Sequence, residues 1–482
     1  MKIPQGVENI IKILEKAEFE AYLVGGCVRD ILNGIEPKDW DIATSAKPDQ
    51  VQKLFPDNVY ENQFGTVGVK TDSENLNLRL IEVTTFRVEG KYSDKRHPDE
   101  IKFAKTIEED LARRDFTINA IAASSNLKLI DPFSGQADLK NKIIKAVGDP
   151  KERFNEDALR MMRAVRFAAV LNFKIEEKTR EAIKKNSNLL QIIAKERIRD
   201  ELIKIIESAR AKEGLELLSD LRLLKFVLPE LEEGINVGQN KHHVYTVWEH
   251  NLRALDYAAK QNYGLETRFA SLLHDVGKPQ SKRGEGPDST FYGHEMIGAK
   301  MATRILERLK FSKKQIEKIS LLIRYHLFYY NVDEVTEASV RRLLGKVGPE
   351  NVEDLINVRK ADRIGSGVPK AEPFKLRHLR YVIEKVSRDP LSVKMLLVKG
   401  EDVMKTLNIG PGPIIGFILN ILLGEALDDP ALNRQDYLTH RIEELGGKSD
   451  AELKKMAKEA EKEREEVQFK IEETSKQRYW VT

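Results

Sequence analysis

Two aspartates that follow a glycine turn could support the transfer of a nucleotide. The turn lies in the stretch LVGGCVRD at residues 23–30, and Asp39 and Asp41 follow in the short segment DWD. Residues two apart on a strand point to the same face, so we expect the two carboxylates to hold divalent metal together. Carboxylate oxygens suit Mg²⁺, and two metal ions can clamp one reacting phosphorus. The pattern therefore predicts a Mg²⁺ site for nucleotidyl transfer.

The glycine turn is expected to receive the phosphates of a nucleoside triphosphate. Gly25 and Gly26 let the backbone come close to the phosphates because no Cβ stands in the way. The helix predicted to begin near Val28 adds backbone N–H donors. Arg29 could bind a phosphate or pair with Asp30, and the sequence leaves both interpretations open.

Two later segments carry side chains that could bind the rest of the nucleotide. Asp115 and Asn119 share one face of a predicted helix and could grip ribose hydroxyls, with Arg114 near the phosphates. A capped, solvated helix face is the alternative. Asp157 and Arg160 are i, i+3 neighbours that could read the Watson–Crick edges of cytosine and adenine. An intrahelical salt bridge is the alternative for this pair.

Histidines and aspartates in a helical block could form a second metal site. At its centre, His274 and Asp275 are adjacent in the segment HDVGK, whose Lys278 could face a phosphate. Imidazole and carboxylate ligands suit Mn²⁺, Ni²⁺ or Fe²⁺, which would activate water toward a phosphoester. His294 and His326 could complete a second metal position. The full candidate set is His250, His274, Asp275, His294, His326 and Asp362. A retained helical scaffold with poor catalysis is the alternative.

The bulk composition bounds the class of protein. A chain of 482 residues with 33% charged and 41% hydrophobic residues indicates a multidomain globular protein. The net charge of +3 does not by itself indicate nucleic-acid binding, although local basic faces could provide it. One cysteine, no apolar signal-peptide core and no apolar run of membrane-spanning length predict a cytoplasmic protein without membrane contact.

The expected secondary structure changes along the chain and gives an α+β fold. Strands are predicted at 21–24, 39–43, 65–70, 78–86 and 101–104, and helices at 7–16, 48–55 and 107–123. Beyond residue 151 helices dominate, at 158–170, 178–185, 196–208 and 215–226. The predicted regions are a mixed-sheet region at 1–148, a helical region at 149–239, a histidine-bearing helical block at 240–368, a second helical block at 369–445 and a charged C-terminal helix or tail at 446–482.

Taken together, the motifs between residues 20 and about 230 resemble the bacterial class II tRNA nucleotidyltransferases, the CCA-adding enzymes and their poly(A) polymerase relatives. They are LVGGCVRD, DWDIAT, FGTVGV, IEVTTFR, EEDLARRDFTINA, EDALRMMRAVRF and ERIRDEL. In the tail, GPGPIIGFILNILLGEALDDP looks like the C-terminal segment of that family. The resemblance implies a polymerase-β-like head followed by neck, body and tail.

This resemblance also implies roles for single residues. Metal would be held by Asp39 and Asp41, and CTP and then ATP would be chosen by Asp157 and Arg160 acting as a protein template. The complete nucleotide-binding set is Gly25, Gly26, Arg29, Arg114, Asp115, Asn119, Asp157, Arg160, Arg163 and Arg166. Glu82 lies on a strand that could bring a third carboxylate nearby, and a packing or surface role is equally open.

Two more features bear on the activity. The segment Val88–Pro98 fills the place of the loop that the family uses when it switches from C to A, which favours full CCA or A addition. The His274–Asp275 pair, with an upstream histidine and a distal aspartate, resembles the HD phosphohydrolase superfamily. That likeness implies phosphatase or 2′,3′-cyclic phosphodiesterase activity in a fused domain.

A basic cluster and the tail are the expected RNA contacts. Helices after the base-reading segment carry Lys174, Lys178, Arg180, Lys184, Lys185, Lys195, Arg197 and Arg199. They could follow the phosphates of a tRNA acceptor arm, and interleaved acids make a generic solvated surface the alternative. The segment Leu407–Leu423 could seat the tRNA elbow.

The sequence thus predicts a Mg²⁺-dependent enzyme that adds CCA to tRNA from CTP and ATP, with a fused HD domain. One rival is an A-adding enzyme or poly(A) polymerase on the same scaffold. A second is chiefly an HD phosphohydrolase whose head binds RNA. The oligomeric state is left open.

Overall fold

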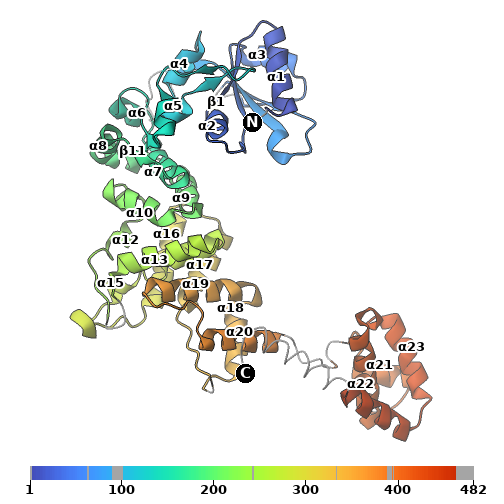
Figure 1. Cartoon of the computed structure of the whole chain (residues 1–482). Coiled ribbons are helices and arrows are strands. Elements are labelled where there is room, and N and C mark those ends of the chain that lie inside the picture. Colours follow the sequence, from blue (N-terminus) through green and yellow to red (C-terminus); the bar gives the residue numbers. More distant parts are fainter. Residues whose placement is uncertain are drawn as a thin grey trace. The chain divides into compact units, whose positions relative to one another are not determined.

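The computed structural model describes residues 3–61, 65–89, 101–240, 244–332, 334–387, 393 and 396–462 (Figure 1). Most of the segment Val88–Pro98 and of the charged C-terminal end lies outside these residues. The chain divides into two compact units. One unit contains Met1–His326 and Asn357–Val368, and the other contains Leu327–Ile356 and Pro369–Thr482. The predicted α+β class, with a mixed sheet in the head and helices beyond it, is confirmed.

A seven-stranded mixed sheet organises the head. Its strand order is β3-β4-β5-β2-β1-β8-β9, and only β2 and β5 among these neighbours run parallel. The strands are β1 (Ala21–Val24), β2 (Asp41–Thr44), β3 (Asn58–Glu61), β4 (Thr66–Lys70), β5 (Leu80–Thr85), β8 (Ala122–Ala123) and β9 (Leu129–Ile130). A separate pair consists of β6 (Arg87–Glu89) and β7 (Ile101–Phe103).

Helices cover both faces of this sheet. Side chains of α1 and α3, which lie side by side in Figure 1, share a core with Leu23 and Ile42 of the central strands. A second core joins Ile107 and Leu111 of α4 to Val24 and Ala43. The head helices are α1 (Gln5–Lys16), α2 (Gly26–Leu32), α3 (Pro48–Leu54), α4 (Ile107–Ala112) and α5 (Gly135–Lys140). Successive residues of β1 and β2 are thus buried in opposite cores, which fixes the register of these two strands beside the glycine turn.

Two predicted elements of the head are shorter than expected. The strand predicted from Asp39 begins at Asp41, so Asp39 lies before it. The helix predicted at 107–123 ends at Ala112, and a 3₁₀ turn at Thr117–Asn119 and strand β8 follow. The Asp115 carboxylate accepts a hydrogen bond of 2.8 Å from the Phe116 N–H, which competes with helical backbone bonding.

Helices form the neck, apart from one short strand. These helices are α6 (Pro150–Glu156), α7 (Leu159–Leu171), α8 (Glu177–Asn186), α9 (Lys195–Glu207), α10 (Ala211–Asp220), α11 (Leu224–Val227) and α12 (Pro229–Glu232). The strand is β11 (Lys174–Ile175), which pairs in parallel with β10 (Ile143–Ile144). The single helix predicted at 215–226 is wrong, because Arg222 takes a left-handed φ of 59° between α10 and α11.

In the described residues of the histidine-bearing block, the regular structure consists of helices. Its helices in the first unit are α13 (Val247–Lys260), α14 (Leu265–Leu273), α15 (Lys278–Ser281), α16 (His294–Arg308) and α17 (Lys313–Tyr325). Helix α19 (Val352–Gly365) ends in the same unit. Apolar residues of α14, α16 and α17 are buried at the packed faces, which leaves the ends of these helices to carry the histidines.

The second unit is helical as well. It contains α18 (Glu337–Val347), α20 (Phe374–Ser387), α21 (Gly400–Leu407), α22 (Pro413–Asp428) and α23 (Gln435–Gly446), with residues 450–462 also helical. Val403, Ile418, Leu422 and Leu438 belong to one core that α21, α22 and α23 share. Within the described part of the chain, no helix has the length and apolar character needed to cross a membrane.

Candidate functional site

One cavity of about 520 Å³ brings the head candidates together. Such a volume is within the usual range for a small-molecule site. All twelve residues predicted to bind Mg²⁺ or nucleotide, eight from the head and four from the neck, line it: Gly25, Gly26, Arg29, Asp39, Asp41, Arg114, Asp115, Asn119, Asp157, Arg160, Arg163 and Arg166. The sequence reasoning did not place Arg113, Leu159, Phe167 and Arg197 there, but they also line the cavity.

The two aspartates lie beside the glycine turn. Gly25 has a φ of 76°, and a Cβ there would come within 3.0 Å of the Arg114 guanidinium and 3.6 Å of the Asp41 carboxylate. Burial raises the pKa of Asp41, the negative charge of Asp39 raises it further, and Arg114 opposes both. A buried carboxylate repelled by its neighbour is stabilised by a divalent cation, so this pair fits a Mg²⁺ site. Glu82 stands opposite Asp41 in the register of β5 and β2.

Asp115 and Asn119 interact even though no helix connects them. The Asn119 amide donates to Asp115 over 3.2 Å, and Arg163 of α7 donates to the same carboxylate over 2.7 Å. Burial would raise the pKa of Asp115, but Arg163 and Asn119 outweigh it and lower this pKa to about 2. Arg29 pairs with Asp30 at 2.7 Å and also donates to Asn119. The alternative of a solvated helix face is wrong, because Asp115 and Asn119 are buried.

Asp157 and Arg160 lie at the junction of α6 and α7. Asp157 is extended, outside both helices, and accepts from the Leu159 N–H. Its carboxylate also pairs with Arg197 of α9 at 2.7 Å. Arg160 pairs with Glu156 at 2.6 Å and donates to the Arg113 carbonyl. Both side chains are therefore held by other partners before any base is present. Asp157 thus lies just outside the helix that carries Arg160.

Several members of the basic cluster have acidic partners. Arg180 and Lys184 both pair with Asp220, and Arg199 pairs with Asp200. These pairs favour the interpretation of a solvated surface for that part of the cluster, whereas Arg197 belongs to the cavity.

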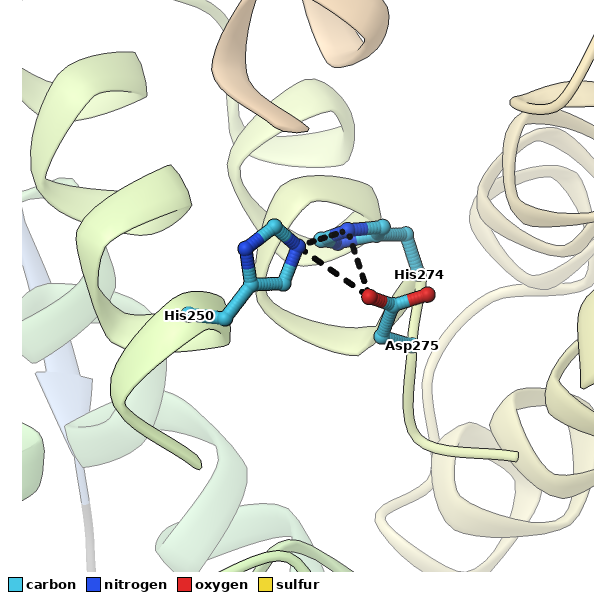
Figure 2. A group of neighbouring side chains, drawn as sticks. All are labelled: His250, His274 and Asp275. Carbon is cyan, nitrogen blue, oxygen red and sulfur yellow. Dashed lines mark hydrogen bonds and ion pairs between the residues drawn. The ribbon is translucent and has the colours of Figure 1, made fainter. Parts of the chain in front are cut away.

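The second site is a buried cluster in the first unit (Figure 2). His250 Nε2 lies 2.9 Å from His274 Nε2 and 3.1 Å from an Asp275 oxygen, as the dashed lines in Figure 2 show. Asp362 lies 3.4 Å from the same His250 nitrogen. These four residues come from α13, the end of α14 and α19.

Two more histidines face the other oxygen of Asp275. His294 Nε2 lies 3.2 Å and His326 Nε2 lies 3.8 Å from Asp275 Oδ1. The ligand atoms of His250, His274 and Asp275, and those of Asp275, His294 and His326, form two groups that could each hold a metal ion. The six residues predicted from the sequence are thus brought together, with Asp275 shared between the groups.

Backbone carbonyls orient three of these imidazoles. The Nδ1 atoms of His274, His294 and His326 lie 2.8, 2.6 and 2.6 Å from the carbonyl oxygens of Ser271, Phe291 and Ile323. A Nδ1–H that donates to a carbonyl leaves Nε2 free to bind metal, and such support is typical of metal-binding histidines. The local helix ends therefore point three Nε2 atoms at one carboxylate.

The electrostatics of the cluster also fit a cation. Burial lowers the pKa of His274, but Asp275 and Asp362 outweigh it and raise this pKa to about 10. Burial and the charge of His274 lower the pKa of His326 to about 3. Within the described residues, neither oxygen of buried Asp275 receives an aligned hydrogen bond, although Lys278 Nζ lies 2.6 Å away. Metal ions would give these acceptors the aligned contacts that they lack.

Three known domain families match parts of the chain. Residues 21–145 match the poly A polymerase head domain. Residues 172–235 match the probable RNA and SrmB-binding site of polymerase A, and residues 247–365 match the HD domain. Nucleotidyltransferase and HD domains are metal-dependent. The predicted resemblance to the poly(A) polymerase and CCA-adding family with a fused HD domain is confirmed.

Curated relatives match about half of the chain in sequence. The CCA-adding enzyme of Ligilactobacillus salivarius is 49% identical over 228 residues, which cover 46% of this chain and 55% of the relative. The CCA-adding enzyme of a Geobacillus strain is 48% identical over 238 residues, which cover 49% and 57%. The chain thus spans about half the length of the curated relatives it matches.

Solved structures match over most of the chain. The Bacillus stearothermophilus CCA-adding enzyme in complex with CTP has a TM-score of 0.61 and 29% identity, and the match covers 92% of this chain and 98% of that one. A tRNA nucleotidyltransferase complexed with a primer tRNA and an ATP analog has a TM-score of 0.55 and 23% identity, over 80% of this chain and 100% of that one. Because its sequence identity is only 23%, the second match shows similarity of the fold alone.

Proposed function

We propose that this chain, with its poly(A) polymerase head, RNA-binding segment and HD domain, is a template-independent tRNA nucleotidyltransferase that adds CCA to the tRNA 3′ end. The observation that carries the proposal is the cavity that all twelve residues predicted to bind Mg²⁺ or nucleotide line together. The CTP complex of the 29% identical structure supports a nucleoside triphosphate as its ligand.

In the proposed reaction the primer 3′ hydroxyl attacks the α-phosphate of CTP or ATP, and pyrophosphate leaves. Asp39 and Asp41 would hold Mg²⁺, which neutralises the triphosphate and activates the hydroxyl. The Gly25–Gly26 turn leaves room for the phosphates because neither residue carries a Cβ. Arg114 is within reach of both the turn and Asp41, where it can bind phosphate oxygens.

Base choice is proposed to rest on Asp157 and Arg160. A carboxylate accepts from the exocyclic amino group that cytosine and adenine share, and a guanidinium donates to their ring acceptors. The contacts of Asp157 with Arg197 and of Arg160 with Glu156 orient both groups at the cavity wall. GTP and UTP offer a carbonyl where CTP and ATP offer an amino group, so the carboxylate disfavours them.

Asp157→Ala is expected to lower the preference for CTP over UTP by 10- to 100-fold, since one such base contact is worth ~1–3 kcal/mol. The measurement is the ratio of kcat/KM values for the two nucleotides on a tRNA that lacks CCA. Asp200→Ala, which removes an exposed carboxylate on α9, is the matched control. An unchanged preference in Asp157→Ala would remove the base-reading role from this residue.

The choice of primer distinguishes CCA addition from the two rival activities, addition of A alone and poly(A) synthesis. One tRNA transcript ends at the discriminator base and a second ends in CC, and each receives a single nucleotide. We expect C on the first transcript and one A on the second. Addition of A to the second without C on the first identifies an A-adding enzyme, and a long A tail identifies a poly(A) polymerase.

The histidine cluster is proposed to be a two-metal phosphohydrolase centre. Asp275 would bridge the two ions, and His250, His274 and Asp362 would bind one while His294 and His326 bind the other. Mn²⁺, Ni²⁺ or Fe²⁺ suits imidazole and carboxylate ligands and would activate water for attack on a phosphate monoester or a 2′,3′-cyclic phosphate. Lys278, beside Asp275, can face the phosphate. If the chain were chiefly a phosphohydrolase, neither of the two tRNA transcripts above would gain a nucleotide. Hydrolysis of the phosphoester would still be measured.

The tRNA acceptor arm is the proposed partner of the neck, and the tRNA elbow that of the tail. The match of residues 172–235 to an RNA-binding segment supports the first assignment. Helix α22 and its preceding turn contain most of the tail segment predicted to seat the elbow. A cytoplasmic location stays a prediction.

A further inference from the structure

Three guanidinium groups surround one aromatic ring in the wall of the nucleotide cavity. The carbon atoms at the centres of the Arg29, Arg163 and Arg166 guanidiniums lie 5.4, 5.5 and 4.1 Å from the centroid of the Phe167 ring. All four side chains line the cavity, and Phe167 is only 7% exposed. Arg29 comes from α2 of the head, whereas the other residues lie on α7 of the neck.

Each arginine also has an acidic partner. Arg29 pairs with Asp30 at 2.7 Å, Arg163 with Asp115 at 2.7 Å and Arg166 with Glu201 at 2.8 Å. The Arg166–Glu201 contact is an ion pair without an aligned hydrogen bond. The arginines still repel one another: burial lowers the pKa of Arg166, and the positive charges of Arg163 and Arg29 lower it further.

The Phe167 ring lies where it can reduce that repulsion. The face of an aromatic ring carries partial negative charge and attracts cations within about 6 Å of its centroid, with more effect where water is excluded. Phe116 supports the ring edge to face, with centroids 5.8 Å apart at an interplanar angle of 82°. An aliphatic side chain of similar size would fill the space but would offer the guanidiniums no negative face.

We propose that Phe167 is a positioning residue that holds Arg29, Arg163 and Arg166 in place to receive the nucleotide triphosphate. The inference rests on the proposed function, since it assigns the cavity to a nucleotide. Guanidiniums held in place before binding need no reordering when the ligand arrives, which strengthens binding. Phe167 therefore acts on nucleotide affinity through the arginines, and the chemical step is left unchanged.

The test varies the partial negative charge on the face of the Phe167 ring while the aromatic ring itself is kept. Phenylalanines with one to four ring fluorines, incorporated at position 167, withdraw electron density from the face at nearly constant size. We expect the KM for CTP and the Kd for CTP binding to rise stepwise, to about tenfold for four fluorines, a loss of ~1.4 kcal/mol. The kcat is expected to stay within about twofold, and Phe167→Leu is expected to raise KM at least as much as four fluorines.

Phe226 is the matched control position, because its ring lies 4.8 Å from Lys225 but is not among the residues that line the cavity. Fluorination there should leave KM and Kd unchanged. Equal CTP affinity across the Phe167 series would overturn the inference, even if Phe167→Leu weakened binding, because the ring would then act by packing alone. An unmodified protein that bound no CTP would contradict both this inference and the proposed function.

Discussion

Replacing Asp41 with asparagine is expected to lower nucleotide addition at least about 10³-fold while the head remains folded. The amide keeps the shape of the carboxylate but lacks the charge that holds Mg²⁺, and loss of ~4 kcal/mol of transition-state stabilisation corresponds to this factor. Asp39→Ala is expected to have the same effect. The measurement is the single-turnover rate of AMP addition to a tRNA that ends in CC.

The free energy of unfolding of the Asp41→Asn variant should equal or slightly exceed that of the unmodified protein. Burial and Asp39 raise the pKa of Asp41, so the ionised carboxylate is less stable in the folded head than in the unfolded chain. A neutral amide removes that cost. Urea unfolding followed by the fluorescence of Trp40, which is buried beside Asp41, tests this expectation. Asp49→Asn on α3 is the exposed control, and an active Asp41→Asn enzyme would refute the metal assignment.

Replacing Asp275 with asparagine is expected to remove bound metal from the HD domain and abolish its phosphohydrolase activity. One carboxylate faces both groups of ligands, so its loss weakens both metal positions. We expect the metal content to fall from about two ions per chain to nearly none, and hydrolysis of a 2′,3′-cyclic nucleotide to fall at least about 100-fold. Inductively coupled plasma mass spectrometry of the purified protein measures the metal content.

Two further variants test whether there are two separate metal positions. They are His326→Asn and the control Asp256→Asn. His326 belongs only to the second group, so its loss should leave one ion bound. Asp256 pairs with Lys260 on α13, away from the ligand groups, and its replacement should leave both ions in place. Nucleotide addition should continue in Asp275→Asn, because the cavity of the head contains none of the HD ligands. Full metal content in Asp275→Asn would contradict the bridging role.

The sequence predicted which residues lie together better than it predicted the elements and contacts that hold them. Asp39 and Asp41 were expected to share a strand face, yet Asp39 lies before β2 and the two meet at the glycine turn. Asp115 and Asn119 were expected to meet on a helix, but a side-chain bond to the Phe116 N–H accompanies the end of that helix. Local periodicity cannot anticipate a side chain that competes with the backbone.

Contacts between distant segments explain what the sequence missed. Arg197 was interpreted as part of an RNA-facing basic cluster, yet it reaches Asp157 across forty positions of the chain. The sequence suggested no role for Phe167, and one of the three guanidiniums around its ring comes from Arg29 on the distant helix α2. The HD ligands were easier to predict, because an adjacent His–Asp pair at a helix end is an unusual local signal.

The most direct test of the account is the sequence that the protein adds to a tRNA transcript lacking CCA. The transcript is incubated with Mg²⁺ and all four nucleoside triphosphates, and the 3′ ends are then sequenced. The account predicts that most extended molecules end in CCA and that addition stops there. Ends that carry only A, ends without selectivity among the four nucleotides, or no extension at all would contradict it.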